Sequence, residues 1–228
     1  MKKNTGEPHL RFAVLAVDVA LMTVRHGKLL IRLTPVHRPH HFPNSTGLPG
    51  GLIDPKETAE EAAHRIIQTK GHIESPVYME QLYTFSEPNR DPRGRVVAVG
   101  YIALIPWDTL STREQEDTDT AWWAPIEEAR DLAYDHDLIR KTAHNRLRAR
   151  TTYSTIVSKL MPHEFTLTDL ELVYESILKT GLDKRNFRKK ILKIQILTAL
   201  NKKRTGGAFR PAELYRFTSP SVKEIEIL

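Results

Sequence analysis

Two glycines, a glutamate and an arginine stand at spacings typical of a phosphate-handling loop and the helix that follows it. Gly50 and Gly51 come first, Glu57 follows Gly51 by six positions, and Arg65 lies eight positions further. Small and branched apolar residues recur at helical spacing over 58–68, so the loop leads into an amphipathic helix. We expect all four residues to serve ligand binding. A structural ion pair is the alternative role for Glu57 and Arg65, and an ordinary turn and helix the alternative for the whole segment.

A second candidate binding segment is rich in arginine and runs over 89–95. Arg90, Asp91 and Arg93 stand in it, between two apolar stretches with the composition of strands. Guanidinium groups suit bidentate contacts with phosphate, so we expect these three residues to bind an anionic ligand. A solvated hairpin loop is the alternative.

Positive charge is concentrated in the last third of the chain. The formal net charge is +6; residues 1–150 hold 20 basic and 20 acidic side chains, whereas 151–228 hold 14 basic and 8 acidic ones. A neutral domain followed by a basic one indicates a polyanionic partner for the second domain only. A basic face that meets only solvent is the alternative.

The basic region has the element order of a winged helix-turn-helix domain. Thr168 and Glu171 predict a capped helix that ends at Gly181, and Asp183 is a suitable N-cap for a second helix over 184–194. Apolar stretches at 196–200 and 213–217 predict a β-hairpin with a basic tip. A winged helix that binds another protein is the alternative. The residues expected to contact DNA are Lys184, Arg185, Asn186, Arg188, Lys189, Lys202, Lys203 and Arg204.

Strand and helix patterns alternate in the first part of the chain. Strands are expected at 12–17, 28–33, 78–85, 96–105 and 121–125, helices at 58–68 and 126–133, and a loop at 34–46. This alternation favours an α/β/α sandwich with a mixed sheet. We expect a sensing domain over 1–136, a winged helix over 163–228, and a linker over 137–162 built on one long helix from 136 to 160.

Composition excludes several classes of protein. The chain has no cysteine, which excludes disulfides, zinc fingers and thiol catalysis. No apolar run approaches the roughly 20 residues that span a bilayer, and the first residues are not a signal peptide, so we expect a cytoplasmic protein without membrane contact. His37, His40 and His41 share a proline-rich stretch without further ligands nearby, so no metal site is expected there.

Together these motifs resemble the Nudix-related transcriptional regulators of the NrtR type. The resemblance covers nearly the whole chain and rests on segments 48–51, 51–65, 90–94, 165–168, 182–191 and 210–215. It implies a Nudix-like α/β/α sandwich followed by a small winged helix-turn-helix domain. It also implies a homodimer joined through the Nudix-like domains.

In Nudix enzymes the arginine of this motif is followed by three carboxylates on one helix face, which hold divalent cations. Ile66, Thr69 and Lys70 stand at those positions here, so we expect no metal, no cofactor and no catalytic residue. The resemblance implies an effector instead, ADP-ribose or a related nucleotide. It further implies a palindromic operator in double-stranded DNA and a repressor of genes for NAD metabolism or sugar use.

The sequence is compatible with two other functions. One is a metal-dependent Nudix hydrolase of a nucleoside diphosphate derivative that uses Glu57, Glu60 or Glu61 in another geometry. The other is a protein-interaction adaptor that is indifferent to DNA.

Overall fold

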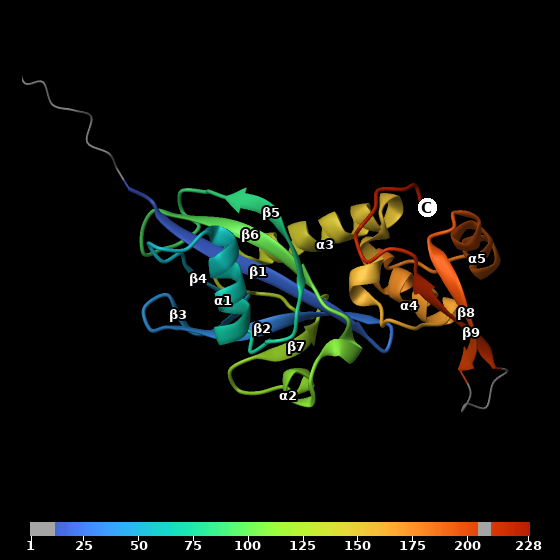
Figure 1. The fold of residues 1–228 in the computed structure, drawn as a ribbon. Helices are drawn as coiled ribbons and strands as arrows, with labels where there is room; N and C mark the ends of the chain where they lie inside the picture. The colour runs from blue at the N-terminus through green and yellow to red at the C-terminus, as the bar shows by residue number, and fades with distance from the viewer. Residues whose placement is uncertain (1–11, 205–210) are drawn as a thin grey trace, which may run out of the picture.

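The computed structural model describes residues 12–204 and 211–228, which form a sheet-based body and a smaller winged helix at its end (Figure 1). The strands of the body are β1 (Val14–Arg25), β2 (Lys28–Arg38), β3 (Phe42–Gly47), β4 (Gly50–Leu52), β5 (Tyr78–Phe85), β6 (Val96–Leu104) and β7 (Trp122–Pro125). Its helices are α1 (Ala59–Thr69), the short α2 (Thr112–Gln115) and α3 (His136–Tyr153), with a 3-10 turn at Trp107–Thr109. None of the helices in these ranges is long and apolar enough to cross a membrane.

The sheet is mixed, as the alternating pattern predicts. Its strands follow the order β3-β2-β1-β6-β5, with β4 paired to β1 and β7 to β2. β1 and β6 run parallel from Val14↔Val96 to Met22↔Leu104, and the other pairs are antiparallel. β1 is much longer than the expected strand at 12–17, because its apolar pattern continues to Val24.

The two faces of the sheet bury two separate cores, so the body is an α/β/α sandwich. α1 covers one face through Ala62, Ala63, Ile66 and Ile67. α3 covers the other face through Ile139, Ala143 and Leu147 (Figure 1). The core on the α3 side continues without a break into the winged helix, where Leu170 and Tyr174 belong to it.

The winged helix consists of α4 (Leu167–Leu178), α5 (Lys184–Lys193) and the hairpin of β8 (Leu197–Arg204) and β9 (Ala212–Phe217). The Asp183 side chain caps α5 by accepting a hydrogen bond from the Asn186 N–H, as expected. Phe187 and Ile191 bury the inner face of α5 against α4. The predicted hairpin is present, but its tip at 205–210 lies outside the described residues.

The stretch 34–46, predicted to be a loop, forms a hairpin instead. β2 continues to Arg38 and pairs with β3 from Thr34↔Gly47 onward, with a bulge between Val36 and Arg38. At Pro35 the strand pairs with β3 alone, so the missing N–H of proline leaves the rest of the sheet intact.

Two predicted helices differ in the structure: one is not formed, and the other ends early. Residues 126–133 form no helix: 126–128 are a turn, and a helix could not continue past Asp131, whose φ is left-handed at 55°. The long helix expected over 136–160 stops at Tyr153, where Ser154 is extended and bridges to Glu224; a 3-10 helix, Thr155–Leu160, follows.

The start of α4 also differs from the prediction. Thr166 is the N-cap and Asp169 completes the capping box, so the helix begins before the expected Thr168. The Asp169 side chain accepts a hydrogen bond from the Thr166 backbone N–H, as a glutamate does in the usual capping box. Glu171 therefore does not cap the helix. Its buried carboxylate forms an ion pair with Arg188 of α5 instead.

Tyr174 provides a test of how the winged-helix core holds α5. Its ring packs on Phe187 with centroids 4.9 Å apart, and its buried hydroxyl has no hydrogen-bond partner in the described part of the chain. We expect Tyr174→Phe to leave the free energy of unfolding unchanged or raise it by about 1 kcal/mol, because it removes an unpaired polar group. Tyr174→Ala should lower it by about 3–5 kcal/mol. Urea denaturation measures both changes, and a clear loss in Tyr174→Phe would refute an unpaired hydroxyl.

Candidate functional site

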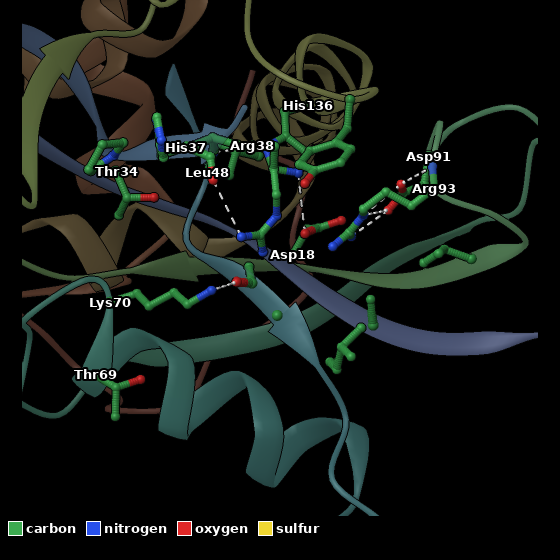
Figure 2. A pocket seen from close by; sticks show the side chains of 18 of the residues that line it. Asp18, Thr34, His37, Arg38, Leu48, Thr69, Lys70, Asp91, Arg93 and His136 are labelled. Atoms are coloured by element: carbon green, nitrogen blue, oxygen red, sulfur yellow. Dashed lines mark hydrogen bonds and ion pairs between the residues drawn. The ribbon is translucent and has the colours of Figure 1, made fainter. Parts of the chain in front are cut away.

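A cavity of about 550 Å³ opens where the sheet meets the ends of α1 and α3 (Figure 2). We call it the cationic pocket, because four of the residues that line it are arginine or lysine: Arg38, Lys70, Arg90 and Arg93. Its walls come from β1, the far end of β2, β4, the last turn of α1, the loop 86–95 and the first residues of α3. Five of the predicted ligand-binding residues line it: Gly50, Gly51, Arg90, Asp91 and Arg93.

The pocket is built around a buried arginine. Nη2 of Arg90 lies 2.7 Å from Oδ2 of Asp18 and 2.6 Å from Oδ1 of Asp135, and its Nε donates to Asp135 at 2.9 Å. Burial lowers the pKa of Arg90, but the two carboxylates outweigh burial and hold the pKa above its usual value. Arg90 therefore stays positively charged. Most of its hydrogen-bond donors bind side chains of the protein itself, so its role is mainly structural.

His136 extends this cluster from the first residue of α3. Its Nδ1 accepts a hydrogen bond from the Leu48 N–H at 2.9 Å, and its Nε2 lies 3.3 Å from Asp18 Oδ1. An Nδ1 that accepts leaves the ring proton on Nε2, where it is donated to Asp18. Burial raises the pKa of Asp18, yet His136 and Arg90 together bring it below the usual 3.8, so the carboxylate stays ionised.

Gly50 is required by this arrangement. It pairs with Asp18 across β1 and β4, and a Cβ at position 50 would collide with the Asp18 carboxylate. The glycine of the sequence motif therefore lets the strand approach a buried charge, and its carbonyl remains at the pocket wall.

Arg93 is the more accessible arginine of the loop. Its guanidinium binds the buried Asp91 carboxylate, with Nη2 2.6 Å from Oδ2, and lies over the Tyr134 ring at 5.5 Å. The Arg93 side chain keeps 41% of its surface exposed, against 3% for Arg90. A ligand can therefore reach Arg93 directly, whereas Arg90 mainly fixes the wall behind it.

Two further cations in the pocket were not selected from the sequence as binding residues. Lys70, at the end of α1, donates a hydrogen bond from Nζ to the Gly50 carbonyl. Arg38, at the end of β2, points into the pocket from the opposite wall (Figure 2). Asp18 was missed as well, although an aspartate within a long apolar strand is the kind of signal that marks a site.

Glu57 and Arg65 lie together but away from the pocket lining. Arg65 donates from Nη2 and Nε to the Glu57 carboxylate at 2.5 and 2.9 Å, and to the Leu52 carbonyl at 2.9 Å. This pair attaches α1 to β4, which matches the structural role held open for it. The hydrogen bond from Arg65 lowers the pKa of Glu57 to about 2.

The divalent cations that a Nudix fold implies do not fit the residues present. Ile66 is fully buried in the core, the Thr69 hydroxyl donates to the Arg65 carbonyl, and Lys70 carries a positive charge. Glu61 is held in the capping box of α1, with Thr58. Over residues 12–204 and 211–228, no group of three or more His, Cys, Asp or Glu side chains is arranged to hold a metal ion.

His37 lines the pocket, whereas His40 and His41 stand in the turn between β2 and β3 and do not. His37 donates from Nδ1 to the Pro43 carbonyl, which holds the hairpin together.

The winged helix presents the second candidate site on α5. Lys184, Arg185 and Lys189 are exposed and have no carboxylate within 4 Å among the described residues. Arg185 and Lys189 are four positions apart and share one helix face. Asn186 is exposed too, but its side-chain amide donates to Asp183 at 3.0 Å, so it also serves the cap.

The other predicted DNA contacts are partly engaged by acidic neighbours. Arg188 binds the buried Glu171 carboxylate and the Thr168 hydroxyl, which ties α5 to α4. On β8, Lys202 lies 3.2 Å from Glu164 and Arg204 lies 2.9 Å from Asp169. Lys203 is exposed between them, without an ion pair in the same described ranges.

Comparison with known families matches both parts of the chain. Residues 13–145 match the NUDIX domain family, and residues 157–217 match the NrtR DNA-binding winged helix domain. The ADPR responsive transcriptional repressor NtrR of Acinetobacter baylyi is 35% identical over 209 residues, which are 90% of this chain and 82% of that protein.

Two solved structures of one relative resemble this chain, one over both of its parts and one over the Nudix domain alone. The crystal structure of Shewanella oneidensis NrtR complexed with a 27mer DNA is 31% identical, with a TM-score of 0.78 over 90% of this chain and 93% of that one. The NUDIX domain of the same NrtR, complexed with ADP ribose, is 29% identical, with a TM-score of 0.53 over 64% of this chain and 99% of that one.

Arg90→Ala tests whether the buried arginine stabilises the fold. We expect this variant to lower the free energy of unfolding by about 3–5 kcal/mol, because it leaves two carboxylates without their shared partner. Chemical denaturation followed by circular dichroism measures the loss. Arg95→Ala, in the same loop but exposed, is the control and should change stability by less than about 1 kcal/mol. Equal stability of the two variants would contradict a structural role for Arg90.

Proposed function

Because the chain belongs to the NrtR-type family, which joins a Nudix domain to an NrtR winged helix domain, we propose that it is an effector-responsive repressor. Its cationic pocket binds ADP-ribose or a closely related nucleoside diphosphate, and its winged helix binds an operator. The observation that carries this proposal is the pocket itself, since it gathers four cations around Gly50 and Gly51 without a carboxylate set for metal.

We propose that the bound nucleotide is an effector and not a substrate. Hydrolysis of a diphosphate needs an activated water, which Nudix folds obtain from metal ions and a carboxylate base. Glu57 has a pKa of about 2 and is occupied by Arg65, so it is a weak base as well as a distant one. The Ile66, Thr69 and Lys70 side chains offer no replacement.

We propose a homodimer that reads a palindromic operator. Phe12 just before β1, Leu15 near the start of β1 and Leu52 on β4 expose 85%, 51% and 50% of their surfaces. Leu52 pairs with Ala16 in the sheet, next to Leu15, and a second copy of the chain would cover such apolar side chains. Two-fold symmetry of the protein then imposes two-fold symmetry on the DNA site.

The effector role predicts that ADP-ribose binds and releases DNA. Titration calorimetry should detect saturable binding of ADP-ribose to the full chain, and gel shifts on its own upstream region should weaken as ADP-ribose is added. Arg93→Ala should weaken ADP-ribose binding by about tenfold, because it removes an accessible guanidinium–phosphate contact. Chromatography should recover the ADP-ribose intact. Steady turnover with Mg²⁺ or Mn²⁺, lost on Glu57→Gln, would favour a hydrolase instead.

The winged helix predicts a separate set of phenotypes. Arg185→Ala and Lys189→Ala should each weaken operator binding and reduce the slope of log Kd against log salt by about one, because each removes a phosphate or base contact. Binding of ADP-ribose should be unchanged in both. Lys56→Ala, an exposed lysine on the body, is the matched control for loss of charge. Operator binding that survives both α5 changes would contradict this assignment of the DNA-binding face.

A further inference from the structure

Lys70 is held where its ammonium group faces the pocket. It is the C-cap residue of α1, and its backbone N–H donates to the Ile66 carbonyl at 2.9 Å. Its side chain runs beneath the pocket to the Gly50 carbonyl, which accepts a hydrogen bond from Nζ (Figure 2). An ammonium group has three donors, so two remain for another acceptor.

The ammonium of Lys70 has cations around it and no carboxylate to pair with. Within the described ranges, neither Lys70 nor Arg38 has a carboxylate within 4 Å. Asp18 is the nearby anion, and it already receives Arg90 and His136. Burial and then the charge of Arg38 lower the pKa of Lys70, with Arg65 and Arg93 adding to the effect. Such a cluster is stabilised when an anion enters it.

The same cluster disfavours a divalent cation. A metal ion beside Lys70 would face like charge from Lys70 and Arg38, and would find no free carboxylate to bind it. A diphosphate, with one negative charge on each phosphate group, matches the two positive charges of Lys70 and Arg38. The charge that a metal supplies in a hydrolase is thus already present as side chains.

We propose that Lys70, together with Arg38, takes the place of the divalent cation and binds the diphosphate of the effector directly. This inference rests on the proposed function and names the residues through which the pocket recognises its ligand. The pocket binds a nucleoside diphosphate without metal, and the ligand is retained uncleaved because an ammonium group neutralises phosphate but activates no water.

The test is titration calorimetry of ADP-ribose against the full chain, in EDTA and in Mg²⁺. We expect the wild-type Kd to differ by less than about twofold between the two conditions. Lys70→Met keeps the length of the side chain and removes its charge, and should raise the Kd by about 10- to 100-fold in either condition. Lys70→Arg keeps the charge and should restore most of the affinity.

Matched controls separate charge from folding. Lys56→Met removes one positive charge from an exposed site of the same body and should leave the Kd unchanged. Lys70→Glu reverses the charge and should lose ADP-ribose binding in EDTA. Thermal melts of all four variants, compared with wild type, report whether each one folds.

The outcomes distinguish this inference from the function on which it rests. ADP-ribose binding that disappears in EDTA and returns with Mg²⁺ would overturn the role of Lys70 and leave the sensor function intact. An unchanged Kd in Lys70→Met would do the same. Failure of the wild-type protein to bind ADP-ribose in both conditions would overturn the proposed effector together with this inference.

Discussion

Arg90 lies between Asp18 and Asp135 in the interior of the protein, where a single unpaired charge would be strongly destabilising. The three residues come from the arginine-rich loop, the centre of β1 and the residue before α3, so their ion pairs fix three walls of the pocket together. Position 50 must be glycine, because a Cβ there would collide with the Asp18 carboxylate. His136 joins Asp18 to the Leu48 N–H. The accessible Arg93 lies in the same loop, three residues after Arg90.

α3 connects this cluster of ion pairs to the winged helix. It begins at the pocket with His136, and further along it His144 meets the Ile177 carbonyl of α4 at 3.0 Å. On its other side Arg150 binds Glu80 of β5 at 2.8 Å, and Lys179 after α4 binds Glu127 of the body. Pocket and winged helix thus share one continuous apolar core, and α3 connects Asp135 at the pocket to α4, on which α5 packs.

Much of this architecture follows from local patterns in the sequence. Helix periodicity located α1, and Asp183 marked the start of α5, because apolar periodicity and capping are properties of the local sequence. The hairpin at 34–46 and the break at Ser154 depend on strand partners far along the chain, which periodicity does not contain. For the same reason the sequence indicated Arg90 and Arg93 together, yet did not reveal that distant carboxylates occupy the first and leave the second accessible.

The packing of Ile66 limits where α1 could carry a carboxylate. It is fully buried among Ala62, Ala63 and Ile67, on the face of α1 that packs against the sheet. A glutamate at this position would place a carboxylate among these apolar side chains, at a cost of several kcal/mol if the carboxylate stayed ionised without a partner. We therefore expect a single Ile66→Glu substitution to weaken the packing of α1 against the sheet. A metal site on α1 would thus require changes in the core around position 66 as well as new carboxylates, so the chemistry of this helix is tied to its packing against the sheet.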